Sequence, residues 1–283
     1  MALMPLGYLK AVVSLGVPSA DAEFTHNGTG FLFHHPLRTA GNRTQYLTFL
    51  VTNRHVVEAG VSHVRFNRVT DDEVRILPIE ELTPPGTAGS WSNHPTEDVV
   101  VRPLLGTGPL MEGRDFIRPE VFLGDVGAPT EEEAQHIVEG NGVLVLGFPL
   151  GLVGDARNYP IVRHGVIARI QDWLRGEAST FLIDSSAFPG SSGGPVIVKP
   201  EATAVKGTTA TTHALLIGVV SGYIPYRDLA VSTQTKTVRI TFEENSGLAE
   251  VVPVRTITET ITLAIARSDD EGFRWRPHVG PNR

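Results

Sequence analysis

Short apolar runs rich in β-branched and aromatic residues alternate with Gly, Pro, Asn or Asp breaks along the first part of the chain. This pattern is typical of β-strands joined by turns. The runs cover residues 30–35, 45–52, 62–67, 72–79 and 98–104, and residues 8–15 are predicted as a further, first strand. Their regular spacing predicts a small antiparallel β-barrel.

A second series of runs with the same character follows. These runs cover residues 141–148, 159–170, 179–184, 194–199, 213–223 and 235–242. The two series together predict an all-β fold of two tandem antiparallel six-stranded β-barrels. The expected division is an N-terminal barrel over residues 1–125, a C-terminal barrel over 126–245, and a C-terminal helix and tail over 246–283.

Two helices are predicted outside the barrels. A Gly- and Pro-rich stretch over residues 105–129 precedes Thr130, and Glu133 three residues later completes a capping-box pattern. This predicts a short interbarrel helix that ends near Gly140. Near the C-terminus, isoleucines at 257, 261 and 265 repeat every four residues, which predicts a C-terminal helix.

Composition limits the partners. The 283 residues carry 24 Lys and Arg against 31 Asp and Glu, so a net charge of -7 favours neither nucleic acid nor an anionic membrane surface. The absence of cysteine excludes disulfides, Cys-ligated zinc and a thiol nucleophile. No apolar run reaches the roughly 18 residues that a membrane helix needs. The apolar N-terminus has no basic start and Lys10 interrupts it, so we expect a cytoplasmic protein, with a signal peptide as the open alternative.

The segment AFPGSSGGPVIV, residues 187–198, places Ser192 among glycines directly before an apolar strand. A serine hydroxyl is a weak nucleophile, so it needs a base, a group that orients the base, and donors for the oxyanion. Gly190 can turn its N–H toward a substrate carbonyl without a Cβ in the way, and the N–H of Ser192 can be the second donor. The sequence thus predicts a nucleophile with Gly190 and Ser192 as its oxyanion hole.

The predicted base is His55, which follows the apolar strand ending at Thr52. The predicted orienting carboxylate is Asp98, at the start of another strand. His94 lies close to Asp98 and competes for the role of base, but the sequence HP is common in surface turns.

Five segments carry a resemblance to a known family. They are GTGFL at 28–32, TNRHVV at 52–57, EDVV at 97–100, GFPLG at 147–151 and GSSGGP at 190–195. On these segments the chain resembles the trypsin-like, chymotrypsin-fold serine peptidases of the bacterial type, and is similar to the protease domain of the high-temperature-requirement proteases. The resemblance implies two perpendicular barrels with His55, Asp98 and Ser192 in the cleft between them, and a serine endopeptidase that cleaves proteins or peptides.

Departures from the family pattern concern activation and specificity. Ser191 stands where zymogen-activated relatives carry an aspartate, so that activation switch is not expected. Ser186 stands where relatives that cleave after Arg or Lys carry an aspartate. Together with Ser221, Gly222 and Tyr223, Ser186 predicts a substrate pocket for a small, polar or apolar side chain; nearby Asp184 leaves a basic preference open.

No metal or cofactor is expected. His34 and His35 are adjacent on a predicted strand, so their side chains point to opposite faces and do not share one ion; we interpret them as an exposed strand end. Two other functions remain open, namely a catalytically silent scaffold that binds peptides by strand addition and an α/β-hydrolase esterase, because GSSGG also satisfies G-x-S-x-G. The sequence leaves the oligomeric state open.

Overall fold

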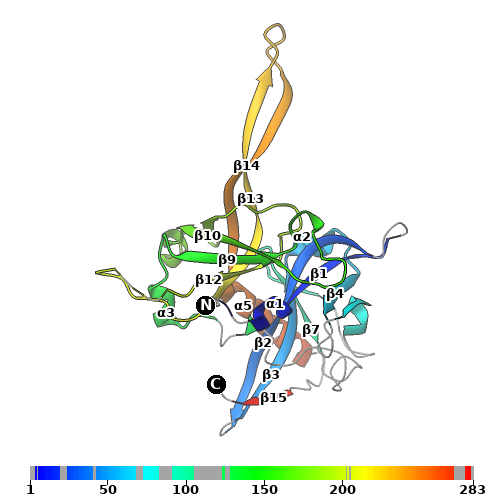
Figure 1. The fold of residues 1–283 in the computed structure, drawn as a ribbon, viewed down its shortest axis with the longest axis vertical. Coiled ribbons are helices and arrows are strands. Elements are labelled where there is room, and N and C mark those ends of the chain that lie inside the picture. Colours follow the sequence, from blue (N-terminus) through cyan, green and yellow to red (C-terminus); the bar gives the residue numbers. More distant parts are fainter. Residues whose placement is uncertain are drawn as a thin grey trace.

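The chain folds into an N-terminal β-sheet and a C-terminal β-barrel, with one long helix where the two meet (Figure 1). The computed structural model describes residues 4, 6–19, 24–40, 43–67, 73–82, 91–104, 123–124, 128–201, 203, 205–270 and 278–281. Most of the Gly- and Pro-rich stretch expected at 105–129 therefore lies outside the described residues.

The N-terminal sheet consists of β1 (Val12–Val17), β2 (Thr25–Ala40), β3 (Arg43–Thr52), β4 (His63–Asn67), β5 (Val74–Pro78), β6 (Ser92–Asn93), β7 (Val100–Leu104), β8 (Leu123–Gly124) and β15 (His278–Pro281). Its order is β5-β4-β1-β2-β3-β7-β6, with β8 beside β2 and β15 beside β3. Together with the C-terminal barrel, this sheet is consistent with the expected double-barrel fold, although it has more than six strands and no pairing joins β5 to β6 among the described residues. The added strands β8 and β15 come from segments that show no strand pattern in the sequence.

The C-terminal barrel consists of β9 (Gly142–Gly147), β10 (Ile161–Arg169), β11 (Phe181–Asp184), β12 (Pro195–Val198), β13 (Leu215–Val231) and β14 (Val238–Pro253). It closes in the order β10-β11-β14-β13-β12-β9, which confirms the predicted six-stranded barrel. Strand β14 continues to Pro253, so the boundary expected at 245 falls inside a barrel strand, and the C-terminal helix begins only at Val254.

The helical elements are short except for the last helix. They are α1 (Leu6–Ala11), α2 (Arg54–Glu58), α3 (Glu131–Gln135), α4 (Gln171–Leu174) and α5 (Val254–Asp270), with 3-10 turns η1 (Ile79–Leu82) and η4 (Pro149–Gly151). Both halves of the predicted capping box are formed at α3, by Thr130 and Glu133. The interbarrel helix is confirmed but shorter than expected, since it ends at Gln135. None of the described helices is long and apolar enough to cross a membrane.

The sequence predicts one strand over residues 8–15, but the structure divides this segment between a helix and a strand. Residues up to Ala11 are helical, and β1 begins at Val12. The change coincides with the first β-branched pair, Val12 and Val13, whose side chains are restricted in a helix and pack well in a strand. Strand β1 is then buried between β2 and β4.

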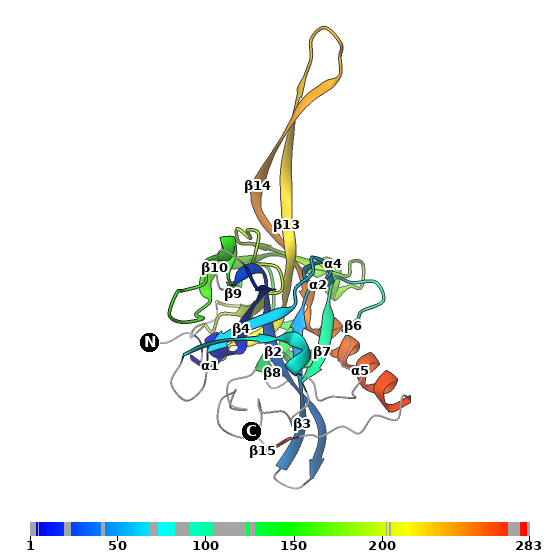
Figure 2. The same cartoon turned by 90° about the vertical axis from the view of Figure 1, so that its right-hand side faces the viewer.

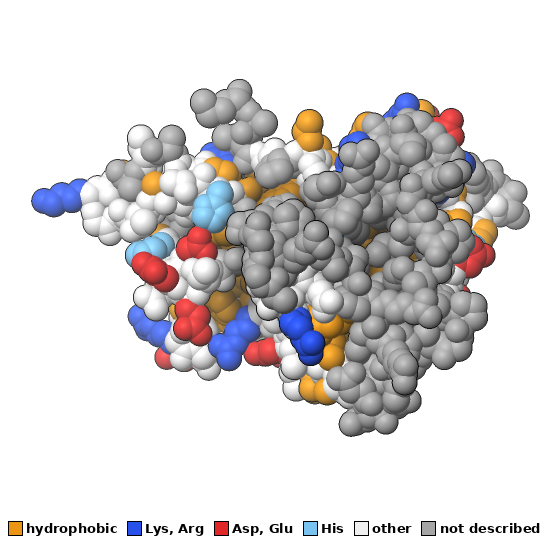
Figure 3. Space-filling model, turned by 90° about the horizontal axis from the view of Figure 1, so that it is seen from below, with side chains coloured by type: hydrophobic (Ala, Val, Ile, Leu, Met, Phe, Trp, Pro, Cys, Tyr) orange, Lys and Arg blue, Asp and Glu red, His pale blue; other side chains and the backbone are white. Residues whose placement is uncertain are grey.

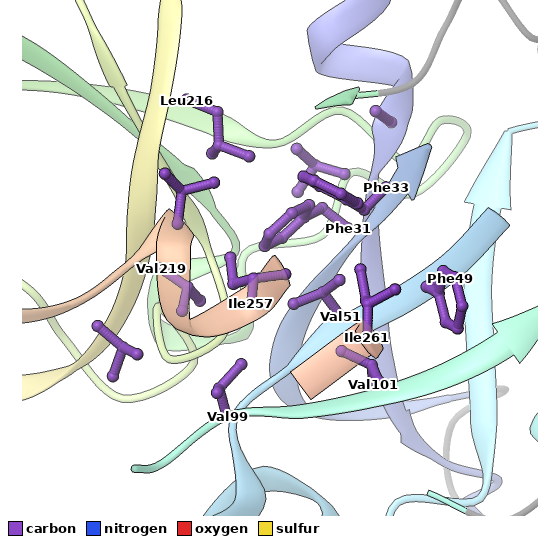
Figure 4. Packing of buried hydrophobic residues seen from close by; sticks show 14 of the residues in the cluster. Phe31, Phe33, Phe49, Val51, Val99, Val101, Leu216, Val219, Ile257 and Ile261 are labelled. Carbon is purple, nitrogen blue, oxygen red and sulfur yellow. The ribbon is translucent and has the colours of Figure 1, made fainter. Parts of the chain in front are cut away.

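Helix α5 fills the junction between the sheet and the barrel. Ile257 and Ile261, four residues apart on one face, are fully buried in a single apolar cluster. Figure 4 shows these side chains between Leu216 and Val219 of the barrel and Phe31, Phe33, Val51 and Val101 of the sheet. The predicted C-terminal helix is thus confirmed, and it stabilises the contact between the two halves by burying apolar surface from both.

Two hairpins extend from this body in opposite directions (Figure 1). The outer parts of β2 and β3 form one, and those of β13 and β14 form the longer one, which Figure 2 shows standing away from the barrel. On the face opposite the β13–β14 hairpin, the described acidic and basic side chains lie interspersed (Figure 3).

Candidate active site

His55 lies at the start of α2, directly after β3. The strand ends at buried Thr52, and Asn53 keeps an extended backbone at the N-cap before the chain turns into the helix. Because β3 packs between β2 and β7, the position of His55 is fixed by the centre of the N-terminal sheet. The His55 side chain itself is 47% exposed and so remains accessible.

Asp98 lies behind His55, in the loop that enters β7. Its Oδ2 is 2.7 Å from His55 Nδ1, and its Oδ1 accepts a hydrogen bond from the His55 backbone N–H at 3.1 Å. Burial raises the pKa of Asp98, but the hydrogen bonds and charge of His55, together with the Arg54 backbone N–H, outweigh it and hold that pKa below 3.8. An ionised carboxylate thus holds the imidazole by its Nδ1 atom.

Neighbours of His55 hold the Asp98 loop from the other side. Asn53 Nδ2 donates to the backbone carbonyl of Asp98 at 2.6 Å, and Arg54 donates to the carbonyl of Glu97 at 2.9 Å and to that of His94. His94 accepts hydrogen bonds from the N–H groups of its own loop and does not line the cavity described below. The sequence does not predict that Asn53 and Arg54 hold the Asp98 loop, because their partners are backbone carbonyls, which a residue pattern does not show.

Ser192 lies in the loop between β11 and β12, next to a tight turn. Ser191 N donates to the Phe188 carbonyl at 2.8 Å, and Gly190 has a φ of +93°, the combination that defines a type II turn with glycine at its third position. Buried Ser191 braces the turn, since its Oγ accepts from the Phe188 N–H at 3.3 Å. Ser191 thus occupies the family's aspartate position with a local hydrogen bond.

Thr29, on β2, contacts both sides of this turn. Its N–H donates to the carbonyl of Ser192 at 2.8 Å, and its Oγ1 donates to the carbonyl of Gly190 at 2.7 Å. The same Oγ1 accepts from the Phe148 N–H at 3.1 Å. One fully buried threonine therefore connects the serine loop of the barrel to the sheet that carries His55.

His26 contacts the same turn through the carbonyl of Gly190. Its Nε2 is 3.4 Å from the Gly190 carbonyl oxygen, and its Nδ1 is 2.6 Å from Ser14 Oγ. Burial lowers the pKa of His26 to about 4, although the Gly190 carbonyl raises it, and the nearby charge of Arg65 lowers it further. The imidazole of His26, which contacts the Gly190 carbonyl of the turn, is therefore neutral at pH 7.

The backbone N–H groups of Gly190 and Ser192 donate to no other described group of the protein. Their carbonyls, by contrast, are taken up by Thr29. Two donors next to a serine hydroxyl are the elements of an oxyanion hole.

His55 and Ser192 line one cavity of about 400 Å³. Its other lining residues are Ala187, Phe188, Pro189, Ser221, Gly222, Tyr223, Pro225, Arg227 and Glu243. Of the predicted pocket residues, Ser221, Gly222 and Tyr223 therefore line it, whereas Ser186 does not. Asp184 is exposed and also lies outside the lining, which leaves Glu243 as its only described acidic side chain.

The hydroxyl of Ser192 does not point to His55. Its Oγ donates to the backbone carbonyl of Ser221 at 3.2 Å, and no hydrogen bond joins these two described side chains, Ser192 and His55. Catalytic hydrogen bonds are often long or misaligned before substrate binds. A rotation about the Cα–Cβ bond of Ser192 moves its Oγ to another staggered position.

One further expectation from the sequence concerns the two adjacent histidines of β2. His34 lies within β2 and is 6% exposed, and His35 beside it is partly buried, so the interpretation as an exposed strand end is wrong. The reason is that β2 continues for several residues beyond them and pairs with β3. Among the described residues, no three His, Asp or Glu side chains gather in a way that could hold a metal ion.

The fold is the first of two findings that relate this chain to known proteins. A mostly β chain with a closed six-stranded barrel against a second sheet has the chymotrypsin-like architecture. Its strands are almost all antiparallel, so the alternative of an α/β-hydrolase is wrong, because that fold needs a parallel sheet alternating with helices.

The second finding is a match to a family model. The model of the trypsin-like peptidase domain matches residues 28–203, more than half of the chain, and this range includes His55, Asp98 and Ser192. The chain belongs to the trypsin-like peptidase domain family. It does not match any of the curated proteins. The likeness to the high-temperature-requirement proteases stays a prediction, because the family match does not distinguish that subgroup.

Proposed function

We propose that the protein is a serine endopeptidase with Ser192 as nucleophile, His55 as general base and Asp98 as the residue that orients His55. The observation that carries this proposal is that Ser192 and His55 line one cavity while Asp98 holds His55 by Nδ1 at 2.7 Å, which leaves Nε2 on the open side of the ring. Family membership supports a protease-type function on protein or peptide substrates.

In the proposed reaction, Ser192 Oγ attacks the carbonyl carbon of the scissile peptide bond while His55 Nε2 takes the hydroxyl proton. The negative charge on the carbonyl oxygen is stabilised by the N–H groups of Gly190 and Ser192. The C–N bond then breaks, His55 gives its proton to the leaving amine, and an acyl-enzyme remains. Water, deprotonated by His55, attacks this ester, and the acid product leaves as Ser192 recovers its proton.

Substrate binding and alignment of Ser192 are connected in this proposal. The Ser221 carbonyl accepts from Ser192 Oγ in the structure, and Ser221 lines the same cavity as Ser192 and His55. A substrate N–H that hydrogen-bonds to this carbonyl displaces the Ser192 hydroxyl, which is then available to His55. Substrate binding thereby favours the reactive arrangement.

We further propose a specificity other than tryptic. The only described carboxylate of the cavity, Glu243, accepts hydrogen bonds from Tyr223 Oη at 3.1 Å and from Arg227 Nε at 3.0 Å. Its charge is thus compensated before a substrate arrives. A small polar or apolar side chain suits this pocket better than Lys or Arg.

Labelling with a fluorophosphonate and mass mapping of the adduct test the mechanism. We expect an adduct on Ser192 in the wild type, none in Ser192→Ala or His55→Ala, and slower labelling in Asp98→Ala. Cleavage of a peptide library then gives the specificity. Loss of Asp98 should reduce kcat by roughly 10³- to 10⁴-fold, because His55 loses its orientation.

The second candidate function is a catalytically silent peptide-binding scaffold. The observation that favours it is the hydrogen bond from Ser192 to the Ser221 carbonyl in place of one to His55. A folded wild type that binds peptides, gives no fluorophosphonate adduct and cleaves nothing would establish this candidate and overturn the endopeptidase.

A further inference from the structure

The long β13–β14 hairpin contains a segment without any third strand. We call residues 225–245 the arm; its pairs run from Pro225 with Asn245 to Val231 with Val238. Below it, β13 also pairs with β12 up to Val219, and β14 pairs with β11 from Leu248 onward. Within the arm, all of which is described, the two strands pair only with each other, and Figures 1 and 2 show it standing clear of the barrel.

The base of the arm is tied to the serine loop. Asn245 Nδ2 donates to the backbone carbonyl of Ala187, five positions before Ser192, and Asn245 Oδ1 accepts from the Gly247 N–H at 2.9 Å. The Gly247 carbonyl in turn accepts from the Ser185 N–H at 2.9 Å. The arm therefore leaves the barrel in a direction set by the same loop that carries the proposed nucleophile.

The arm also contributes to the cavity of the active site. Arg227 and Glu243, which face each other across the two strands, line the cavity that contains His55 and Ser192. Pro225 lines it as well. The cleft thus continues from the proposed nucleophile onto the arm without interruption.

One edge of β13 is open from the active site to the tip of the arm. On this edge, the pairing with β12 reaches only to Val219, which pairs with Pro195, the first residue of β12. Beyond it, Ser192 Oγ contacts the Ser221 carbonyl. In a two-stranded antiparallel ribbon, alternate N–H and C=O groups of each strand point outward without a partner strand. An extended polypeptide can pair with such an edge by strand addition.

The arm exposes apolar side chains as well as an open edge. Those at least 49% exposed are Tyr226, Leu229, Val231, Val238, Ile240 and Phe242. An isolated two-stranded ribbon is only marginally stable in water, and a third strand or another apolar surface stabilises it. Exposed apolar side chains along an open strand edge suit a partner segment that is extended and apolar.

We propose that the β13 edge from Ser221 to Val231 binds the substrate polypeptide as an added strand, over roughly ten residues on the N-terminal side of the scissile bond. This inference rests on the proposed endopeptidase function. The direction follows from β12, which lies on the same edge antiparallel to β13. A segment collinear with β12 runs from the arm tip toward the barrel, so it presents its C-terminal end to Ser192.

The proposal defines a substrate class. The substrate must pair along about ten residues and also enter the cleft at Ser192, so we infer that it is an unfolded or flexible polypeptide with apolar side chains upstream of the cut. The arm selects by length and extended backbone, whereas the cavity selects by the side chain at the cut.

Peptide binding to Ser192→Ala protein tests the arm without requiring catalysis. The probe is a fluorescent peptide that alternates Val and Thr over about ten residues, a strongly strand-forming sequence. The matched peptide carries N-methyl groups on alternate residues, which removes the N–H donors that strand pairing needs. The shortened-arm variant lacks residues 226–244 and joins Pro225 to Asn245, which pair in the wild type, through an Asn-Gly turn.

We expect Ser192→Ala to bind the probe roughly tenfold more tightly than the same protein with the shortened arm, and the N-methylated peptide to lose this advantage. Leu229→Ser should weaken binding, whereas Leu263→Ser should not; the two side chains are 52% and 48% exposed, and Leu263 lies on α5 away from the arm. Equal affinity of full-length and shortened arms would overturn the proposal. So would a wild-type dimer that the shortened arm abolishes without any peptide binding, since the arm would then contact a second copy.

A second measurement connects the arm to the reaction. A peptidyl phosphonate with an N-terminal extension of about ten residues should label the wild type roughly tenfold faster than one without it, and the shortened arm should remove this gain. An equal gain from a C-terminal extension would overturn the assigned direction. Failure of a simple fluorophosphonate to label Ser192 overturns the endopeptidase alone, because the Ser192→Ala binding experiment reports on the arm independently.

Discussion

At the scale of single residues, the site is held mainly by hydrogen bonds to backbone carbonyls. Thr29 contacts the carbonyls of Gly190 and Ser192, and Asn53 contacts that of Asp98. The bonds from Thr29 fix the two peptide groups whose N–H groups belong to Ser191 and Gly193 and donate to the carbonyls of Phe188 and Val220, so the backbone of the serine loop is held on both sides of Ser192. The family motifs containing Thr29 and Asn53 therefore have a physical basis beyond the three proposed catalytic side chains.

Thr29→Val should reduce activity more than Thr29→Ser. Valine keeps the shape but leaves the carbonyl of Gly190 and the N–H of Phe148 without their Oγ1 partner in a buried place. Losing a buried partner costs about 1–3 kcal/mol, so we expect kcat/KM to fall roughly tenfold or more. Steady-state cleavage and urea unfolding measure the two effects, and a Val variant as active as the Ser variant would contradict the role of Oγ1.

His26 should make stability depend on pH. Its pKa is about 4 in the folded protein and 6.5 in the unfolded chain, so the unfolded state binds more protons in between. The contribution is fully present above pH 6.5 and is lost as pH falls toward 4. Asp98 acts in the same direction but only in more acidic solution, because its unfolded pKa is 3.8.

Urea midpoints of wild type and His26→Gln across this pH range test the assignment. We expect the wild-type midpoint to fall from pH 6.5 to 4 and that of the variant to change much less. Parallel curves for the two proteins would show that His26 is not the group responsible.

At the scale of elements, the serine loop depends on a glycine that nothing else can replace. Gly193 has a φ of +85°, and a Cβ there would collide with the carbonyl oxygen of Thr29 and with Thr52 Oγ1. The loop therefore fits against β2 and β3 only when residue 193 has no side chain.

Gly193→Ala should abolish labelling of Ser192 and destabilise the protein by more than about 2 kcal/mol, because backbone strain adds to a steric clash. Gly207→Ala is the matched control. Its φ is +92°, but nothing lies within 4 Å of the added Cβ, so it should cost only about 1 kcal/mol. Similar losses for both variants would assign the effect to φ alone.

Helix α5 contributes to stability through its buried face. Ile261→Ala should destabilise the protein by about 2–5 kcal/mol, because it opens a cavity where the sheet and the barrel meet. Leu263→Ala, two residues along on the exposed face, should cost less than about 0.5 kcal/mol. Denaturant unfolding of both variants separates burial from helix propensity, and equal losses would place α5 outside the core.

At the scale of the whole molecule, local patterns predict more than long-range pairing. Strand alternation identifies the barrel strands, and the four-residue isoleucine spacing identifies α5. The motifs locate His55 and Ser192, which line one cavity, and Asp98, which contacts His55 Nδ1, whereas the hydrogen bond from Ser192 to Ser221 is not visible in the sequence. The sequence does not reveal that β13 and β14 continue beyond the barrel, because exposed and buried strands share the same β-branched residues.

The position of α5 in the chain also sets the order in which the molecule can be completed during synthesis. Translation delivers strands β1 to β8 of the sheet first, the barrel next and Ile257 and Ile261 after both, although the cluster they join contains residues from each half. A nascent chain that already carries His55, Asp98 and Ser192 still lacks the side chains that close its shared core. If the protein is the proposed endopeptidase, we expect its activity to arise only after the ribosome has synthesised α5.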